Sequence, residues 1–457
     1  MAPTLKRTLL FKTVLSAALL NMGGAQAVSI QDAVHASLNN HPQIEQAEAR
    51  RNAAKQEMAS ARSGFFPGLS VGLTGGRMYG DNATARGTAT TRGAAYSGVG
   101  EGTASLQQPI FDGFEALSRV RSTKAGVRSA GLELQDVKEQ IAFQTVEAYL
   151  NVMMARSVLR QIEEQEQKVA DYLKRIKETV DDGGSDEAQL QQAKDVRATL
   201  KGYVADYIGQ LQAYESQYLE LTGSMPGMDL EMPEIRPLAM PPTIEETIAM
   251  AQSRHPAILA AREDSKSAAY DVLVEKSELY PELLGELSYL KSDKREALGG
   301  EVEDRRAVLR LNWEFETGGG QYARIKQRRF EQAETRAKEK EIFRQVERDI
   351  RIAYSEYNVA KERLSNQKDR VELNQKLFDT YETQFEGGLV SLLQLMQADN
   401  QVFNTKVDEN IQFYRLLVAR YGVIASLGLL QHDLFQTASV QELEPKLQKA
   451  DMDEPKK

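Results

Sequence analysis

The sequence predicts a mixed α/β membrane protein, with long antiparallel helices, four strands per chain and an internal two-fold repeat. Three observations lead to this class. A helical motif occurs twice, about half the chain apart, two very long stretches contain no proline, and short segments alternate between apolar and polar residues. Helices far longer than those of globular domains must lie against each other or against other copies. The alternating segments are typical of strands.

The repeat is the clearest feature of the chain. "SIQDAVHASLNNHPQI" begins at Ser29, and "TIEETIAMAQSRHPAI" begins at Thr243, 214 residues later. Between about residue 68 and residue 106 the offset falls to 205, and it then holds. It relates Leu106 to Leu311, Gly113 to Gly318, Tyr149 to Tyr354, Gly183 to Gly388, Leu190 to Leu395 and Ala193 to Ala398. A constant offset over so many matches indicates an internal duplication.

The repeat divides the chain into segments. The predicted order is a signal peptide, a first repeat, a proline-rich connector, a second repeat and a polar tail, at residues 1–27, 28–221, 222–242, 243–430 and 431–457. Each repeat is predicted to contain a helical segment, a β-hairpin, a long helix and a shorter helix. The last three span about 66–112, 114–180 and 185–221 in the first repeat, and about 280–316, 319–385 and 389–430 in the second.

The first 27 residues have the three parts of a secretory signal. Basic residues (Lys6, Arg7 and Lys12) precede a short apolar run, and Ala25-Gln26-Ala27 is an A-x-A cleavage site. The chain contains no cysteine, so neither disulfides nor an N-terminal lipid anchor are expected. The net charge of -9 argues against binding to nucleic acid.

The two proline-free stretches predict helices about 100 Å long. Their apolar residues form a narrow seam: Val169, Leu173, Ile176 and Val180 are spaced by 4, 3 and 4 residues, as in a coiled coil. Each His-Pro pair, at His41 and His255, predicts that a short helix ends and a longer one begins. A metal or catalytic histidine is the less favoured alternative, because the sequence has no ligand spacing or catalytic motif around it. We therefore expect no enzyme activity, metal or cofactor.

The segments between the helices have a period of two. Leu69, Val71 and Leu73 alternate with Ser70 and Gly72, and a second series runs through Ala307, Leu309, Leu311, Trp313 and Phe315. Such strands either pack on a soluble core or face lipid. Aromatic residues near the ends of the strands favour lipid, as a membrane belt would: Phe65, Phe66, Phe111, Tyr280, Trp313 and Phe315.

Four strands cannot close a barrel, and an open edge in lipid leaves backbone amides unpaired. The sequence therefore predicts a β-barrel shared between protomers, continuous with a long antiparallel α-helical barrel of coiled-coil type. At least two copies are needed, and three would give a wider lumen.

These features together resemble the TolC family of outer-membrane efflux and secretion ducts, from the mature N-terminus to about Leu430. The resemblance implies a homotrimer in the outer membrane with a shared twelve-strand barrel and a helical tunnel across the periplasm. It also implies that the helix tips dock a periplasmic adaptor and an inner-membrane transporter. The family's tip motif matches "DDGGSDEAQLQQA" from Asp181 and "FEGGLVSLLQLMQA" from Phe385.

Two sets of site residues follow from that resemblance. The adaptor-docking tips are Gly183, Gly184, Ser185, Gly387, Gly388 and Leu389, and the pore constriction is Asp186, Glu187, Gln189, Phe385, Val390, Gln394 and Gln397. The chain departs from the family at the constriction, where Gln189 stands at a common acidic position and Val390 at a basic one. The pore is therefore expected to be held shut by hydrogen bonds and packing, without buried ion pairs.

Three functions remain open at this point. An ABC transporter for type I protein secretion is favoured as the inner-membrane partner, with protein as the cargo. The first alternative is a pump that exports small molecules such as drugs. The alternative from another class is a soluble periplasmic coiled-coil scaffold.

Overall fold

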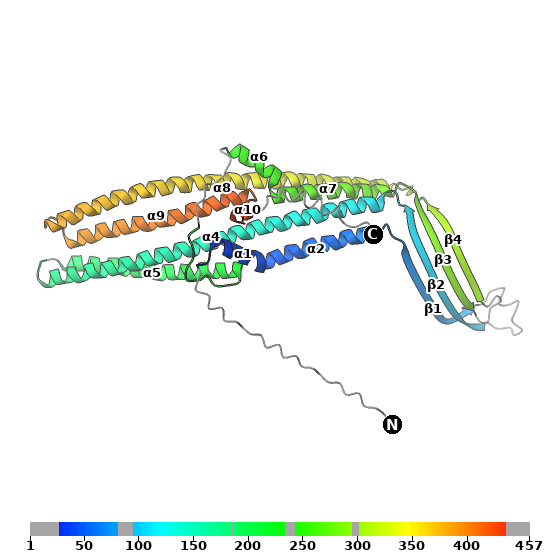
Figure 1. Ribbon diagram of the computed structural model, residues 1–457, viewed down its shortest axis with the longest axis horizontal. Helices are drawn as coiled ribbons and strands as arrows, with labels where there is room; N and C mark the ends of the chain where they lie inside the picture. Colours follow the sequence, from blue (N-terminus) through cyan, green and yellow to red (C-terminus); the bar gives the residue numbers. More distant parts are fainter. Residues whose placement is uncertain (1–26, 81–94, 185, 234–242, 295–300, 436–457) are drawn as a thin grey trace, which may run out of the picture.

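The computed structural model describes residues 27–80, 95–184, 186–233, 243–294 and 301–435. Within these ranges long helices form a rod. A four-stranded sheet lies at one end of the rod, and the α4–α5 and α8–α9 connections lie at the other (Figure 1). Apart from Ala27 the predicted signal peptide lies outside the described residues. So do Ser185, residues 234–242 of the connector, and the tail from residue 436.

Each repeat has the predicted succession of elements. The helices of the first repeat are α1 (Ile30–Asn40), α2 (Pro42–Ser63), α4 (Glu115–Asp181) and α5 (Glu187–Thr222). Those of the second are α6 (Ile244–Arg254), α7 (Pro256–Ser277), α8 (Gly320–Glu386), α9 (Leu392–Ser426) and α10 (Leu430–Phe435). The strands are β1 (Gly68–Gly80), β2 (Ala95–Phe111), β3 (Glu282–Lys294) and β4 (Glu301–Asn312). The two long helices, α4 and α8, have 67 residues each.

The two His-Pro pairs are helix boundaries, as predicted. His41 ends α1 and caps α2, where its Nδ1 accepts a hydrogen bond from the amide of Gln43 at 3.3 Å. His255 does the same for α7, accepting from the amide of Ala257 at 3.2 Å. In both helices proline occupies the first turn, which needs no amide donor. The motif is repeated because it starts the same kind of helix twice.

In the half of the rod that carries the turns, α4 packs on both α5 and α9, and α9 packs on α8, so that α5 and α8 form the two edges there (Figure 1). In the half next to the sheet, α2 and α7 pack on α4, and α7 packs on α8. The predicted seam on α4 is confirmed. Val169 and Ile176 are buried in a cluster with residues of α5 and α9, and Leu173 and Val180 pack against it. Burying a narrow stripe of each helix is what allows helices of this length to stay ordered.

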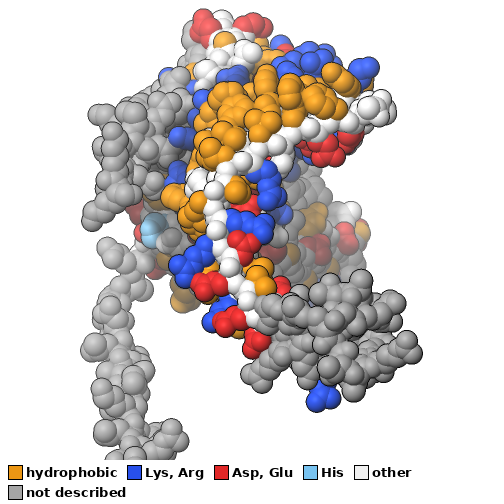
Figure 2. Space-filling model, turned by 90° about the vertical axis from the view of Figure 1, so that its right-hand side faces the viewer, with side chains coloured by type: hydrophobic (Ala, Val, Ile, Leu, Met, Phe, Trp, Pro, Cys, Tyr) orange, Lys and Arg blue, Asp and Glu red, His pale blue; other side chains and the backbone are white. Residues whose placement is uncertain are grey.

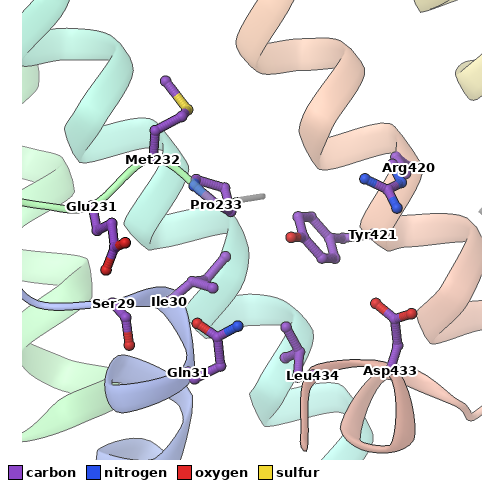
Figure 3. A pocket seen from close by; sticks show the side chains of 10 residues that line it. All are labelled: Ser29, Ile30, Gln31, Glu231, Met232, Pro233, Arg420, Tyr421, Asp433 and Leu434. Atoms are coloured by element: carbon purple, nitrogen blue, oxygen red, sulfur yellow. The ribbon is translucent and has the colours of Figure 1, made fainter. Parts of the chain in front are cut away.

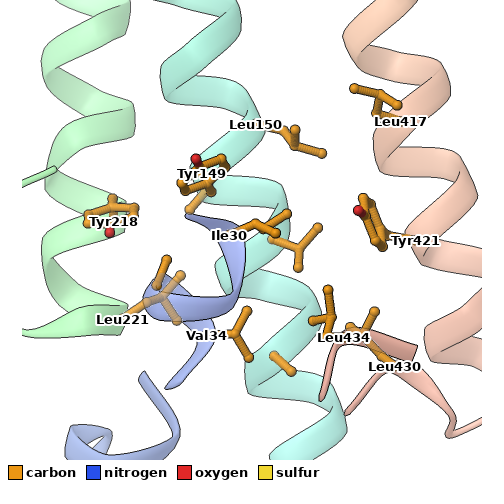
Figure 4. Close-up of a cluster of buried hydrophobic side chains, with 14 of the residues drawn as sticks. Ile30, Val34, Tyr149, Leu150, Tyr218, Leu221, Leu417, Tyr421, Leu430 and Leu434 are labelled. Carbon is orange, nitrogen blue, oxygen red and sulfur yellow. The ribbon is translucent and has the colours of Figure 1, made fainter. Parts of the chain in front are cut away.

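The largest core cluster lies midway along the rod, where elements from both ends of the chain meet (Figure 4). It includes Ile30 and Val34 of α1, Tyr149 and Leu150 of α4, Leu417 and Tyr421 of α9, and Leu430 and Leu434 of α10. These side chains come from helices that are distant in sequence. The cluster therefore ties the two repeats together.

The first described residues are held by the connector. The amide of Val28 donates to the carbonyl of Asp229 at 3.1 Å, and a parallel bridge joins Val28 to Leu230. The hydroxyl of Tyr149 donates to the carbonyls of Val28 and Glu231, at 2.7 and 2.6 Å. One buried tyrosine on α4 thus fastens both the start of α1 and the connector.

The end of the second repeat differs from the prediction of a helix to 430 and a polar tail from 431. Helix α9 ends at Ser426, and Gly428 takes a φ of +68°. A short helix, α10, then folds back onto α4, with Leu430 fully buried. This helix was not predicted, because six residues, half of them apolar, are too few to show a helical periodicity.

Candidate functional site

The two helix-to-helix turns at the far end of the rod, between α4 and α5 and between α8 and α9, have the same backbone conformation. In the α4–α5 turn Gly183 has a φ of +75°, and in the α8–α9 turn Gly388 has a φ of +68°. The amide of Gly184 donates to the carbonyl of Thr179 at 2.8 Å, and the amide of Leu389, at the equivalent position, donates to Gln384 at 2.9 Å. Glycine adopts this left-handed conformation without steric cost.

The side chains of the two turns differ although their backbones match. In the first turn Asp186 caps α5, accepting from the amide of Ala188 at 3.3 Å, and Glu187 follows it. In the second turn Leu389 is 79 % exposed, and Ser391 caps α9. The first turn is therefore acidic and the second partly apolar.

The predicted constriction residues lie around these turns. Gln397 is exposed and Gln189 and Val390 are half-buried. Gln394 is exposed too, but its side-chain oxygen accepts from the amide of Ser391 at 2.8 Å, within a capping box. Phe385 lies under the guanidinium of Arg175, 5.7 Å from the ring centre, and so links α8 to α4.

A buried polar contact near the turns was not predicted. Gln165 of α4 donates to the carboxylate of Asp399 of α9 at 2.9 Å, and both residues are at least nine-tenths buried. Tyr172 lies nearby, and burial, with the charge of Asp399, raises its pKa to about 12. The sequence gives the residue types but not the pairing, because the two helices meet only in the folded rod.

The sheet at the other end of the rod is antiparallel with the order β1-β2-β3-β4. One face carries Leu69, Val71, Leu73, Leu309 and Leu311, each between 63 % and 87 % exposed. Figure 2 shows apolar side chains gathered at this end of the molecule, beside a zone of basic and acidic ones. The predicted alternation runs past the strand itself, because β4 ends at Asn312, before Trp313 and Phe315.

The predicted aromatic residues lie where the strands join the helices. Five of them are about half exposed or more: Phe65, Phe66, Tyr280, Trp313 and Phe315. Trp313 and Phe315 have ring centres 4.8 Å apart, and the indole of Trp313 donates to the carbonyl of Leu279 at 3.3 Å. Phe111 instead makes an edge contact with Phe114 at 5.4 Å.

The opposite face of the sheet is mainly polar and charged, although exposed valines, Val302 and Val308, also lie on it. Arg310 pairs with Glu286 at 2.8 Å, Arg306 pairs with Asp304, and the hydroxyls of Ser70 and Ser105 are 2.6 Å apart. An exposed apolar face on one side and a mainly charged face on the other fit contact with lipid and water better than the core of a soluble sandwich.

A cavity of about 190 Å³ lies beside the central core (Figure 3). It is lined by Ser29, Ile30, Gln31, Glu231, Met232, Pro233, Arg420, Tyr421, Asp433 and Leu434. Its volume is below that of ordinary ligand pockets, about 300–1,000 Å³. The described residues contain no group of three or more His, Asp or Glu side chains placed to hold a metal ion. In the same residues, no helix is both long enough and apolar enough to cross a membrane.

A rod of long helices joined to an apolar-faced sheet is the architecture of an outer-membrane channel subunit. The chain belongs to the outer membrane efflux protein family, whose model matches residues 33–224 and 247–429. Proteins of this family are transport channels of the TolC type rather than enzymes, and the family points to the bacterial outer membrane.

Curated relatives agree with this assignment. The outer membrane efflux protein BepC of Brucella suis is 21% identical over 423 residues, which cover 92% of this chain and 90% of BepC. The outer membrane protein TolC of Escherichia coli is 20% identical over 428 residues, covering 89% and 83%. The alkaline protease secretion protein AprF of Pseudomonas aeruginosa is 31% identical over 134 residues, covering 29% and 27%.

Solved structures support the fold. The CmeC outer membrane channel of Campylobacter jejuni superposes with a TM-score of 0.76 at 16% identity, covering 88% of this chain and 86% of CmeC. CusC superposes with a TM-score of 0.76 at 13% identity, covering 87% and 92%.

Proposed function

We propose that three copies of this chain form a continuous channel-tunnel, which exports cargo across the periplasm and the outer membrane. The observation that carries the proposal is the open four-stranded sheet with its exposed apolar face. Both outer strands, β1 and β4, have one edge without a partner in the described chain. In lipid every backbone amide must be paired, so these edges require strands from other copies. Three sheets give a closed barrel of twelve strands.

The helices offer a matching pair of edges. Exposed apolar side chains lie on α5, at Tyr203 and Ile208, and on α8, at Ile352, Val359 and Leu373. Because α5 and α8 lie on opposite sides of the rod, α5 of one copy would meet α8 of the next. Repeating that contact around a three-fold axis closes a helical tunnel beneath the barrel.

The mass of the purified protein in detergent and its resistance to extraction from the membrane test the proposed trimer. The mature protein should have the mass of a trimer in mild detergent, stay in the membrane through a carbonate wash, and form channels in planar bilayers. A folded monomer in mild detergent would refute the trimer. Release by carbonate would favour the soluble scaffold.

We propose that the cargo is protein, delivered by an inner-membrane ABC transporter and a periplasmic adaptor in type I secretion. The AprF match supports this choice, because AprF is named for protease secretion. Small-molecule efflux is the alternative, because BepC, which matches over 423 residues, is named an efflux protein. Deleting the gene distinguishes the two hypotheses. Loss of secreted proteins would support protein secretion, and drug sensitivity with normal secretion would support small-molecule efflux.

The two turns are the proposed docking tips, with Gly183, Gly184, Ser185, Gly387, Gly388 and Leu389 in contact with the adaptor. Cysteines placed next to Gly184 or Gly388 should cross-link to an adaptor, since the chain has no native cysteine. Cross-links only to other copies of the chain would contradict this.

The proposed constriction is neutral at Gln189, Gln394 and Gln397, so it should bind divalent cations weakly. Millimolar divalent cations should leave the single-channel current unchanged, whereas Gln397→Asp should introduce block. Gln401→Asp, one turn further from the tip on the same exposed face of α9, tests whether the block depends on the constriction itself and should introduce a weaker block. Strong block of the native channel would contradict a neutral constriction.

A further inference from the structure

A shallow groove runs along one exposed face of α8, near the middle of the helix. Two adjoining hollows of about 470 and 570 Å³ form it, and all the residues that line them belong to α8. The charged residues of the groove are four basic and three acidic ones: Lys340, Arg344, Arg348 and Arg351, and Glu341, Glu347 and Glu356. Arg351 pairs with Glu347 at 2.8 Å, whereas Arg344 has no ion-pair partner among the described residues. The groove therefore offers a cation that no second element of the described chain covers.

The repeat identifies the counterpart of this groove in the first half of the chain. The offset of 205 residues relates Glu139 of α4 to Arg344 of α8. Glu139 is the residue that holds α10, because its carboxylate accepts from the amides of Leu430 and Gln431, at 2.8 and 3.2 Å. The groove on α8 thus lies where the first repeat has its docking site for α10.

The segment equivalent to α10 is the start of the connector. Gly223 follows α5 with a φ of +78°, and Gly428, 205 residues later, follows α9 with a φ of +68°. The chain therefore leaves both helices through the same left-handed conformation. The residues that come next differ in burial, because Leu430 is fully buried, whereas its equivalent Met225 is 61 % exposed and Met228 is 95 % exposed. The connector carries apolar side chains that its own copy leaves uncovered.

The hydrogen-bonding groups are exchanged on both sides of the equivalent contact. Where Glu139 accepts, Arg344 can only donate. Where α10 supplies two amides, the connector has Met225 and Pro226, and a proline keeps its carbonyl but has no amide to donate. A guanidinium that faces carbonyls is as complementary as a carboxylate that faces amides.

The connector and the groove belong to opposite edges of one copy, at the same level along the rod. The end of α5 lies level with α6, which packs on α8 beside Val346 (Figure 1). Copies repeated around a three-fold axis would bring these two edges together. Charge favours the contact as well, because residues 202–234 include six acidic residues and no lysine or arginine.

We propose that the groove on α8 is the docking site for the connector of the neighbouring copy, with Arg344 donating to the carbonyls of Met225 and Pro226. Met225 then packs on α8 as Leu430 packs on α4. The inference rests on the proposed trimer and adds a contact outside the paired helices. Each copy both offers a connector and receives one, so the groove is complete only in the assembly.

Cysteine cross-linking tests the contact, because the chain has no native cysteine. In mild detergent, Met225→Cys combined with Arg344→Cys should form covalent dimers and trimers with a short bismaleimide, at the expense of the monomer band. Co-expressed copies that carry only one of the two cysteines should give dimers but no trimers, because each link joins different copies. Met225→Cys combined with Lys326→Cys is the matched control. Lys326 is exposed on the same face of α8, but 18 residues, about 27 Å, nearer the sheet.

A trimer in which the Met225–Arg344 pair cross-links no more than this control would overturn the connector contact and leave the proposed channel intact. A monomer in mild detergent would refute the trimer, and the contact with it. If Arg344→Cys weakens assembly, Lys340→Cys, one turn away in the same groove, takes its place. With that second pair, Arg344→Glu should reduce the cross-linked yield, since it sets a carboxylate against carbonyls; an unchanged yield would overturn the role of Arg344.

Discussion

The contact between α4 and α10 predicts an unusual pH dependence of stability. Glu139 is 7 % exposed, and its carboxylate accepts from the amides of Leu430 and Gln431, at 2.8 and 3.2 Å, and from the Gln431 side chain at 3.1 Å. Burial, the largest effect, raises the pKa of Glu139 from 4.5 to about 7, although these hydrogen bonds lower it. The folded protein therefore keeps this proton at pH values where the unfolded chain loses it.

Because the folded protein binds this proton more tightly than the unfolded chain, its stability should increase as the pH falls. The stabilising contribution of Glu139 is fully present below pH 4.5 and is lost as the pH rises through about 7. The difference between the pKa of 4.5 in the unfolded chain and about 7 in the folded protein corresponds to about 3 kcal/mol of folding stability. Between pH 8 and pH 5 the wild-type protein should gain most of this stability. Glu139→Gln cannot titrate, so its gain over the same range should be smaller by about 2–3 kcal/mol.

Hydrogen exchange of the α10 amides, corrected for the intrinsic pH effect, measures this directly. A change of about 3 kcal/mol is about a hundredfold in protection, because every 1.4 kcal/mol is tenfold. Asp136→Asn is the comparison variant: it removes the charge of Asp136, the weakest of the effects on the pKa of Glu139, and should change the pH profile of α10 far less than Glu139→Gln. Burial also raises the pKa of Asp136, to about 6, but its side chain bonds Gln140 on the same helix instead of α10. A wild-type pH profile of α10 protection in Glu139→Gln would refute the role of Glu139.

Further predictions concern the turns and the N-terminal contact. Gly388→Ala should lower the unfolding free energy by about 1 kcal/mol in a thermal melt, because alanine is strained at a φ of +68°. Gly387→Ala should be nearly neutral in the same melt, because Gly387 has a φ of -79°. Equal effects of the two variants would contradict this. Tyr149→Phe removes the hydroxyl that donates to Val28 and Glu231 and should cost about 1–3 kcal/mol. Limited proteolysis should then cleave the connector faster; unchanged cleavage would mean that the bridge between Val28 and the connector holds without the hydroxyl.

The helices and strands were predictable because their signals are local. The coiled-coil seam, the proline-free stretches and the His-Pro boundaries depend on residues within a few turns of each other. The alternation of Leu69, Val71 and Leu73 likewise depends only on the period of a strand. The short helix α10 was not predicted, because six residues are too few to carry a periodic signal.

The site was predictable only in part. The sequence marks both glycine turns, because positive φ restricts the residue type, and it marks the aromatic residues at the strand ends. It does not reveal that Gln165 bonds Asp399, or that the side chain of Gln394 caps its own helix. Side-chain orientation at the turns depends on how four helices pack, which no single segment specifies.

By itself, the sequence determined the duplication, the lengths of the helices, and a sheet with one apolar face. The tertiary structure alone decided what joins the halves: Tyr149 bonded to the connector, and Glu139 bonded to residues 291 and 292 positions further along the chain. It also decided the register of the four strands, which places Leu69, Leu106, Leu287 and Ala307 side by side across the sheet. Periodicity is a property of neighbouring residues, whereas register and long-range contacts exist only once distant segments have been brought side by side.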